Sequence, residues 1–281
     1  MLQLKSLSYH YPKSKTVLDN VSLTFAEGTI YGLFGKNGEG KSTLMKIMSG
    51  LLFPKSGQCT ILGQPTAKRL ASSLQNLFLV PEDFELPNLT IATYEKIYSP
   101  FYPAFSRHLF YELLQEFKLH HQEKTARLSF GQKKKILIAF GIATQTKLLL
   151  LDEPTNGLDI PSKSQFRKIM AEAVDQGRSI IISTHQVRDL HSLIDQIVIL
   201  DNCKVIFDHS LSEISENLWF GRASNVPNEV ILYTETSFGG KAVMKRLDQE
   251  ETEVDLELLF NAVLNNPKGI QLALEQVYHG V

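Results

Sequence analysis

The sequence Gly35-Lys36-Asn37-Gly38-Glu39-Gly40-Lys41-Ser42 decides the fold class of this 281-residue chain. It follows the pattern G-x-x-x-x-G-K-[ST], in which glycines allow backbone N–H groups to close around phosphate oxygens. The apolar stretch Ile30–Phe34 precedes the motif, and apolar residues at helical spacing follow it as far as Leu51. Because the motif requires a strand before it and a helix after it, the sequence predicts a loop that binds nucleotide phosphates.

Two side chains of this loop are expected to act directly on the nucleotide. Lys41 should reach the β- and γ-phosphates, and Ser42 should coordinate Mg²⁺. The other contacts would come from backbone groups and neighbouring positions. The candidate nucleotide-binding residues of the segment are Gly35, Asn37, Gly38, Gly40, Lys41, Ser42 and Thr43.

The pattern on either side of the loop predicts an α/β fold. Over about the first 205 residues apolar stretches alternate with helical patterns, which is typical of a largely parallel sheet. From Pro81 to about Leu128 the pattern is helical, with Ser106 as an expected N-cap, and predicts an inserted helical subdomain. Continuously apolar stretches, expected to be strands buried on both faces, are Ile30–Phe34, Leu77–Val80, Leu148–Leu151, Ile180–Ser183 and Ile197–Leu200.

The composition argues against several classes of protein. The chain has 29 basic and 30 acidic residues and a net charge of −1, whereas a nucleic-acid-binding protein usually carries a basic excess. Cys59 and Cys203 are far apart in the sequence, which favours a reducing compartment. No apolar stretch approaches the roughly 20 residues that a membrane-spanning helix needs. We therefore expect a cytoplasmic protein with no nucleic-acid partner.

A second candidate site follows the apolar stretch Leu148–Leu151, which ends in Asp152 and Glu153. Carboxylates at the carboxyl end of a parallel strand lie in the crevice where ligands bind. Asp152 is therefore expected to hold the Mg²⁺ shell, and Glu153 to polarise an attacking water. The alternative is a strand that simply ends in a polar turn before Pro154, and the phosphate loop argues against it.

A third candidate site is Leu128-Ser129-Phe130-Gly131-Gln132, which precedes an apolar helix. Ser129 and Gln132 have the spacing of a capping box, and a helix N-terminus attracts anions. The alternative is a well-made helix start with no ligand. The next residues, Lys133–Lys135, are expected to lie on a solvated helix face.

The order of these motifs resembles that of the ATP-binding cassette (ABC) ATPases over roughly residues 2 to 210. The resemblance also rests on Thr155-Asn-Gly-Leu-Asp159 and Ser183-Thr-His185. It implies a phosphate-loop NTPase of the ABC type: a mainly parallel sheet core with an antiparallel β edge, a helical subdomain at about 82–135 and a small C-terminal extension. The implied domains are an ABC ATPase domain at 1–210 and an extension of unknown role at 211–281.

The resemblance implies a head-to-tail dimer that contains two nucleotide sites. Ser129 and the backbone of Gly131 would contact the γ-phosphate held by the partner's phosphate loop, and Asp159 would lie at the dimer seam. In the same site Glu153 would be the catalytic base and His185 would touch the γ-phosphate.

The adenine contact remains open between two tyrosines. Tyr11 would stack on the base, with Tyr9 as the rival, and both could instead pack on the edge of a sheet.

Two positions depart from the family pattern. In the family the segment Leu128–Gln132 corresponds to the cassette signature, which usually has two central glycines. Phe130 replaces the first of them, and a bulky side chain there affects how closely the partner's phosphate approaches. Glu82 stands where a glutamine usually contacts Mg²⁺ and the attacking water. A carboxylate can still bind Mg²⁺, but it adds negative charge beside the γ-phosphate and so affects the rate of hydrolysis.

The function implied is that of an ATP-binding and ATP-hydrolysing subunit of an ABC transporter, with an exporter favoured. The chain would pair with a copy of itself or a related ABC subunit and drive a separate transmembrane permease from the cytoplasmic face of the membrane. We expect aromatic residues of the helical subdomain, Phe84, Tyr94, Tyr98 and Tyr102, to border the groove that receives the permease. The alternatives are a non-transport ABC ATPase and a slowly hydrolysing ATP switch.

Overall fold

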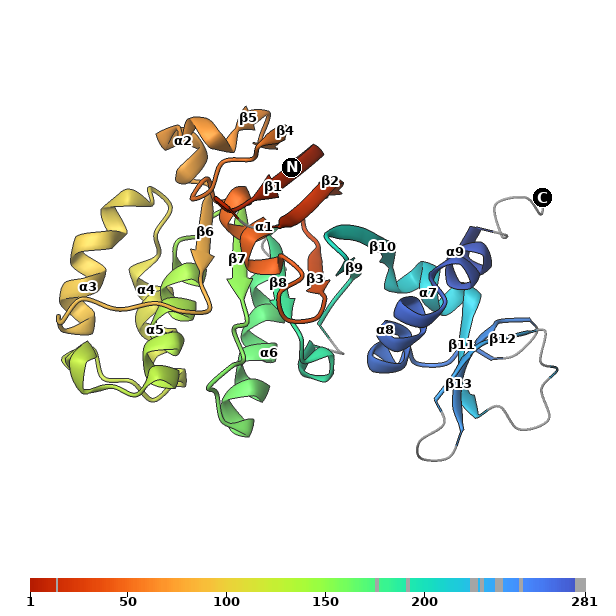
Figure 1. Cartoon of the computed structure of the whole chain (residues 1–281). Helices are drawn as coiled ribbons and strands as arrows, with labels where there is room; N and C mark the ends of the chain where they lie inside the picture. Colours follow the sequence, from red (N-terminus) through yellow and green to blue (C-terminus); the bar gives the residue numbers. More distant parts are fainter. Residues whose placement is uncertain are drawn as a thin grey trace.

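A six-stranded sheet forms the centre of the computed structural model, which describes residues 1–13, 15–174, 177–190, 193–222, 227, 230–235, 240–247 and 250–275. Its strand order is β10-β9-β3-β8-β7-β6 (Figure 1). All neighbours are parallel except β10, which forms an antiparallel hairpin with β9. The strands are β3 (Ile30–Phe34), β6 (Leu77–Val80), β7 (Leu148–Asp152), β8 (Ser179–Thr184), β9 (Gln196–Asp201) and β10 (Lys204–Ser210).

The five strands predicted from apolar stretches are therefore confirmed. Their continuous apolar character has a clear cause, because side chains alternate between two cores on opposite faces of the sheet. In β7, Leu149 and Leu151 enter one core while Leu148 and Leu150 enter the other. The edge strand β6 is less enclosed, so two of its four residues are half-buried.

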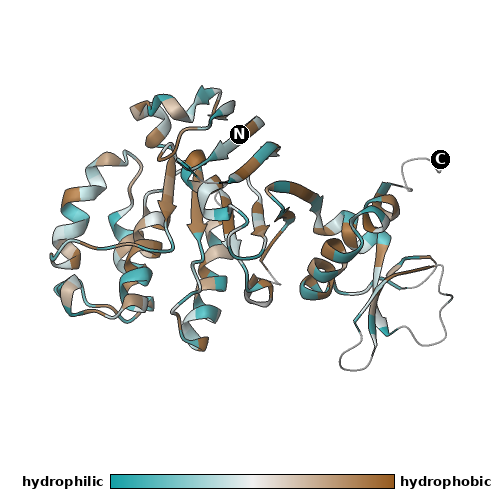
Figure 2. Cartoon of the chain, viewed as in Figure 1, coloured by the Kyte–Doolittle hydropathy of each residue, from teal (hydrophilic) through white to brown (hydrophobic). Residues whose placement is uncertain are grey.

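A second, antiparallel sheet packs over one of these faces and provides the predicted antiparallel edge. Its strand order is β2-β1-β4-β5, and helix α1 (Lys41–Met48) lies between the two sheets (Figure 1). Apolar residues of both sheets and of α1 share one core, and the central strands β6 and β7 are mostly brown in Figure 2. The strands are β1 (Leu2–His10), β2 (Thr16–Phe25), β4 (Ser56–Ile61) and β5 (Gln64–Pro65).

The helical subdomain lies beside the β6 edge of the central sheet (Figure 1). Thr90 and Ser106 cap two of its helices, each accepting a hydrogen bond from a backbone N–H three residues later. The predicted N-cap at Ser106 is therefore confirmed. The elements here are α3 (Ile91–Tyr98), α4 (Arg107–Glu116) and α5 (Phe130–Ala143), with the short helices η2 (Ser99–Phe101) and η3 (Thr125–Arg127). Two further short helices, η1 (Thr66–Lys68) and α2 (Ala71–Leu74), lie outside the subdomain, between β5 and β6 in sequence and near β4 and β5 in Figure 1.

The prediction of a solvated face for Lys133–Lys135 is wrong for Lys134. The Lys134 side chain is fully buried, while its two neighbours are half-buried. Helix α5 is buried on every side from Ile136 onward, so it has no continuous polar face. Only its first turns reach solvent, and Lys134 points inward from them.

The described residues after β10 form a smaller sheet with three helices, on the opposite side of the central sheet from the helical subdomain (Figure 1). Its antiparallel strand order is β11-β13-β12, and side chains of helix α8 share a core with η4 (Val187–Leu190) of the ATPase part. No helix in the described part of the chain is long and apolar enough to cross a membrane. The remaining elements are α6 (Ile160–Val174), α7 (Leu211–Asn217), β11 (Leu218–Arg222), β12 (Ile231–Thr234), β13 (Lys241–Lys245), α8 (Leu256–Asn265) and α9 (Pro267–Glu275).

Candidate active site

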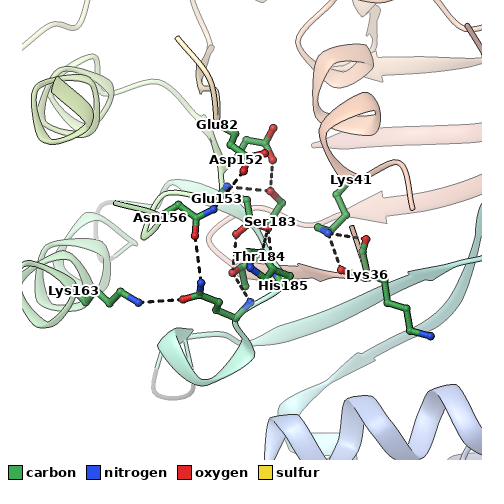
Figure 3. A network of polar contacts seen from close by, with 12 residues as sticks. Lys36, Lys41, Glu82, Asp152, Glu153, Asn156, Lys163, Ser183, Thr184 and His185 are labelled. Carbon is green, nitrogen blue, oxygen red and sulfur yellow. Dashed lines mark hydrogen bonds and ion pairs between the residues drawn. The ribbon is translucent and has the colours of Figure 1, made fainter. Parts of the chain in front are cut away.

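The phosphate loop connects β3 to α1 and closes around its own lysine. Gly40 has a φ of +95°, and a Cβ there would lie 2.9 Å from the Val17 carbonyl oxygen, so a side chain would be both strained and obstructed. Lys41 Nζ donates hydrogen bonds to the carbonyl oxygens of Gly35 at 2.7 Å and Lys36 at 3.1 Å (Figure 3). Burial lowers the pKa of Lys41, and Glu153 and Asp152 act in the opposite direction. The ammonium is thus held by the loop's own carbonyl oxygens, and Lys41 lines the cavity beside the loop.

A cavity of about 410 Å³ opens beside this loop and brings most of the predicted residues together. Its size is in the usual range for small-molecule sites. Val17 also lines it and was missed in the sequence, since an apolar residue on a strand gives no functional signal. The predicted residues that line it are Tyr11, Asn37, Gly38, Gly40, Lys41, Ser42, Thr43, Glu82, Glu153 and His185.

The two tyrosines proposed for the adenine contact lie in different environments. Tyr11 lines the cavity, and its hydroxyl is 3.1 Å from Thr43 Oγ1. Tyr9 is 6% exposed and contacts the Tyr11 ring edge to face. Tyr11 is therefore the tyrosine that a nucleotide in this cavity would meet.

Asp152 is the last residue of β7 and precedes Glu153, which lines the cavity, but Asp152 itself is not among the lining residues. Its carboxylate is buried and accepts a hydrogen bond from the Ser183 hydroxyl of the neighbouring strand β8 (Figure 3). Ser42 and Glu82 line the cavity. These oxygen ligands fit Mg²⁺, which is usually bound by one or two carboxylates together with phosphate oxygens. In the described ranges no group of three or more His, Cys, Asp or Glu side chains lies close enough together to hold a metal ion by itself.

Glu153 directly follows β7 and has a strained backbone. Its N–H donates a hydrogen bond to the Ser183 carbonyl oxygen of the neighbouring strand β8. Its φ of +45° is rare for a residue with a side chain and is typical of functional sites. The carboxylate accepts hydrogen bonds from the Thr184 hydroxyl at 3.1 Å and the His185 backbone N–H at 3.0 Å. His185 Nδ1 lies 2.8 Å from the same carboxylate (Figure 3). The structure thus pairs the candidate base directly with the candidate switch histidine.

Glu82 reaches this network from the loop after β6. Its Oε1 accepts a hydrogen bond from Asn156 Nδ2 at 3.3 Å, and Asn156 Oδ1 accepts one from Gln186 at 3.4 Å (Figure 3). Gln186 Oε1 in turn accepts a hydrogen bond from Lys163 Nζ, on helix α6, at 3.1 Å. Asn156 was missed in the sequence analysis because its role depends on the fold bringing it beside Glu82.

The three predicted residues of the dimer contact lie outside this cavity. Ser129 caps α5 in the predicted capping box with Gln132. A Cβ on Gly131 would lie 2.5 Å from the Gly157 carbonyl oxygen, so the signature and the turn before Asp159 are in close contact. Asp159 is exposed, and its pKa is lowered because its carboxylate accepts hydrogen bonds from Ser162. Ser129 and Asp159 are exposed and Gly131 is half-buried, and none of the three lines the cavity that contains Lys41.

A second, smaller cavity of about 260 Å³ lies on the other side of the phosphate loop. It contains Gly35, the remaining predicted loop residue, together with His185. Phe260 from helix α8 of the C-terminal extension also lines it. Nothing in the sequence around Phe260 distinguishes it from an ordinary core residue, so this contact could not be predicted.

The phosphate loop after β3 and the two carboxylates at the end of β7 together define the class of protein. It is a phosphate-loop nucleotide hydrolase with an inserted helical subdomain. Residues 18–156 match the family described as ABC transporter. The chain is 37% identical to an uncharacterised ABC transporter ATP-binding protein, YybJ of Bacillus subtilis, over 65% of this chain and 85% of that protein. It is 32% identical to the lantibiotic transport ATP-binding protein SrtF of Streptococcus pyogenes, over 78% of this chain and 94% of that protein. The chain therefore belongs to the ABC transporter family.

Further relatives and solved structures agree with this assignment. The methionine import ATP-binding protein MetN of Carboxydothermus hydrogenoformans is 30% identical over 82% of this chain and 72% of its own length. A structure of an ATP-binding subunit of an ABC transporter has a TM-score of 0.70 at 29% identity, covering 76% of this chain and 92% of that chain. A dimeric ATP-binding cassette with ADP and Pi shares the fold, with a TM-score of 0.67 at 24% identity over 75% and 99% of the two chains. The protein is thus an ATP-binding subunit of the ABC type and an ATPase.

Proposed function

We propose that the chain drives an ABC exporter by binding and hydrolysing Mg-ATP in a head-to-tail dimer on the cytoplasmic face of the membrane. The observation that carries the proposal is the meeting of Lys41, Glu153 and His185 around one cavity, while the signature lies outside it with Ser129 and Phe130 exposed. A site divided in this way becomes complete only when a second cassette supplies the missing contacts. The partner cassette is a copy of this chain or a related subunit.

Each side chain has a distinct part in the proposed reaction. Tyr11 would hold the adenine, and the loop with Lys41 would bind the β- and γ-phosphates. Glu153 would accept a proton from the attacking water, while His185 would orient Glu153 and touch the γ-phosphate. On the opposing protomer, the signature would stabilise the charge that develops as the bond breaks, which is the role of groups supplied in trans in related enzymes.

Mg²⁺ would be held by Ser42, Asp152 and Glu82. When bound, it neutralises charge on the phosphates during transfer. Asp152 is buried and accepts a hydrogen bond from the Ser183 hydroxyl, whereas Glu82 is half-buried and accepts one from the Asn156 amide. The two carboxylates would therefore approach the ion from differently buried positions.

The surface for the permease would lie on the helical subdomain. Tyr98 and Tyr102 are half-buried and Phe101 is 63% exposed, so this face offers apolar area to a partner. Tyr94 differs from the expectation for a groove residue, because it is 7% exposed and packs on Phe140 inside the subdomain. We propose Phe101 in its place at the contact.

We also propose that residues 1–210 form the ATPase domain, that 82–135 is its helical subdomain, and that 211–281 is an extension. The extension has its own three-stranded sheet, which supports the division. Its core continues into the ATPase core, so we expect the two parts to fold together.

Replacing Glu153 by Gln tests the proposed reaction. We expect ATP hydrolysis to fall by about 10²–10⁴-fold because the proton acceptor is lost, while ATP binding persists. With hydrolysis blocked, light scattering should show the monomer mass doubling when Mg-ATP is added. Glu251→Gln, a change in the extension far from the loop, is the control and should leave hydrolysis unchanged.

Two other results would contradict the proposal. Hydrolysis that is slow in the wild type and unaffected by Glu153→Gln would instead support the ATP switch. A variant that binds ATP and stays monomeric would contradict pairing with a copy of itself and point to a related subunit.

The direction of transport needs a separate test in cells. The relatives include import and export proteins by name, among them a Nod factor export ATP-binding protein of Burkholderia lata. We expect cells carrying Glu153→Gln in place of the wild type to accumulate the cargo inside and lose it from the medium, measured by comparing metabolites in both fractions. Depletion inside the cell would instead identify an importer.

A further inference from the structure

Lys134 is the one lysine side chain of α5 that is completely buried, and its surroundings are unusual for a lysine. Its Nζ donates hydrogen bonds to the backbone carbonyl oxygens of Glu82 at 2.9 Å and Pro81 at 3.2 Å. In the described part of the chain no carboxylate lies within ion-pair distance of this ammonium. A buried charge that has only neutral acceptors is costly unless the site is arranged for it.

Two aromatic rings complete the site around the ammonium. Phe84, from the loop after β6, and Phe130, from the signature, stack with ring centroids 5.1 Å apart and an interplanar angle of 29°. Lys134 Nζ lies 5.3 Å from the centroid of each ring. An ammonium in this position is attracted to both ring faces. We call Lys134, Phe84 and Phe130 the lysine clamp.

The lysine clamp joins two segments that are distant in sequence. One is the loop carrying Glu82, which lines this chain's own nucleotide cavity. The other is the signature, which stays exposed outside that cavity. The clamp uses Phe130, the signature residue that departs from the family pattern, and its lysine binds the backbone carbonyl of Glu82, the other departure. The two departures are therefore physically connected.

The charge on Lys134 also suits this place. Burial lowers its pKa, while Asp152, Glu82, Asp83 and Glu153 raise it. The ammonium thus lies in the field of the carboxylates around the proposed Mg²⁺ position. It partly offsets the negative charge that Glu82 introduces beside the γ-phosphate.

We propose that Lys134 is a positioning residue that fixes the Glu82 loop against the signature, so that the placement of Glu82 beside the proposed Mg²⁺ position depends on the placement of the signature. The proposal rests on the proposed role of Glu82. In a head-to-tail dimer the signature would face the partner's nucleotide while Glu82 faces this chain's own. The lysine clamp would therefore link the two nucleotide sites of the dimer through one protomer.

Steady-state ATP hydrolysis with Mg²⁺ as the varied probe tests the proposal. For Lys134→Met we expect kcat to fall about tenfold to a hundredfold, as for other misplaced site groups. The Mg²⁺ concentration for half-maximal rate should rise, while binding of Mg²⁺-free ATP stays unchanged. Lys133→Met is the matched control, because Lys133 is next in sequence and lies outside the clamp, and it should keep the wild-type Mg²⁺ dependence.

Two further variants separate positioning from a general structural role. Lys134→Arg keeps a cation and hydrogen-bond donors and should recover part of the Mg²⁺ dependence, whereas Lys134→Gln, which keeps a donor without charge, should recover less. If Lys134→Met is too unstable to assay, Phe84→Leu removes one ring from the clamp and should raise the Mg²⁺ requirement in the same direction.

The double variant Glu82→Gln/Lys134→Met makes the outcome decisive. If Lys134 acts through Glu82, the double variant should have the Mg²⁺ requirement of Glu82→Gln alone. Additive effects, or a Lys134→Met variant that loses thermal stability with an unchanged Mg²⁺ requirement, would overturn the proposal. If Glu82→Gln alone leaves the Mg²⁺ requirement unchanged, the proposed role of Glu82 fails instead, which is a separate result.

Discussion

Glu153 is held by more donors than a free catalytic base would be. Thr184 and the backbone and ring of His185 all contact its carboxylate. A base held in this way has a fixed direction but must release one partner when water and phosphate enter. The strained backbone at Glu153 fits such a position, since the residue directly follows β7 and its N–H is held by the Ser183 carbonyl oxygen of β8.

Replacing His185 by Ala removes one of these contacts and leaves the backbone donor in place. We expect ATP hydrolysis to fall by about 100-fold, the lower end of the range for a proton-transfer group, because Glu153 loses its orientation while remaining able to accept a proton. His209→Ala is the control, since His209 also lies near a glutamate, Glu213 at 3.5 Å, but far from the loop. Equal activity of the two variants would contradict the assignment of His185.

The buried thiol of Cys59 makes the stability of the folded protein depend on pH. Burial raises the pKa of Cys59 to about 11 from its ordinary value near 9. The folded protein therefore binds this proton more tightly than the unfolded chain does. The resulting stability is fully present below about pH 9 and is lost as the pH rises through about 11.

Urea unfolding from pH 8 to pH 11 measures this effect. The free energy of unfolding should fall with a slope of at most about 1.4 kcal/mol per pH unit from this group. Cys59→Ala should have a smaller slope than the wild type, while Cys203→Ala, which removes a half-buried thiol, should keep the wild-type slope. Identical slopes for the wild type and Cys59→Ala would show that the buried thiol does not control stability in this range.

Serine side chains cap the N-termini of helices α4 and α5. Ser129 caps α5 and Ser106 caps α4, and each side-chain oxygen accepts a hydrogen bond from the N–H three residues later at 3.2 Å. Replacing either serine by alanine should lower the free energy of unfolding by about 1 kcal/mol. Only Ser129→Ala should also reduce ATP hydrolysis in the dimer, because only α5 begins at the proposed contact with the partner's nucleotide.

Thermal unfolding and ATPase assays of the two variants check this prediction. If Ser106→Ala reduced hydrolysis as much as Ser129→Ala, the loss would reflect helix stability alone and the signature would have no separate role.

The elements that could be predicted are those whose signal is local. The strands of the central sheet are continuously apolar because both faces are covered, and the phosphate loop is a contiguous motif. Strands β11 to β13 are short and partly exposed, so their pattern is weak. Lys134 and Phe260 depend on which segments the fold brings together, and neither has a neighbour in sequence that indicates its contact.

Of the two apolar cores in the described residues, one continues across the proposed domain boundary. Ile214, Leu218 and Leu259 of the extension share a cluster with Val187 and Leu190 beside the site. Burying each such side chain contributes about 1.5–3 kcal/mol. A fragment ending at Ser210 would expose this surface, and we expect it to unfold at a lower temperature than the full chain, as measured by circular dichroism. Equal melting temperatures would identify the extension as an independent domain.

Phe260 offers a milder test of the same connection. Phe260→Ala shortens the side chain that lines the small cavity beside the phosphate loop and should weaken ATP binding several-fold, because the loop loses a packing neighbour. Leu272→Ala, a change at a position that is 55% exposed on α9, is the control. Calorimetric titration with ATP measures both, and equal affinities would separate the extension from the site.

The strand order also determines when the phosphate loop can form during synthesis. In the central sheet strand β3 pairs with β8 and β9, and Ile30 lies opposite Ile180, which is synthesised much later. The loop after β3 therefore lacks its neighbouring strands until β8 and β9 have left the ribosome. At about 5–20 residues per second, that delay is on the order of 10–30 seconds. A nascent chain stalled before β8 would therefore carry the complete nucleotide motif without the sheet that shapes it, and ATP would first become a folding ligand late in translation.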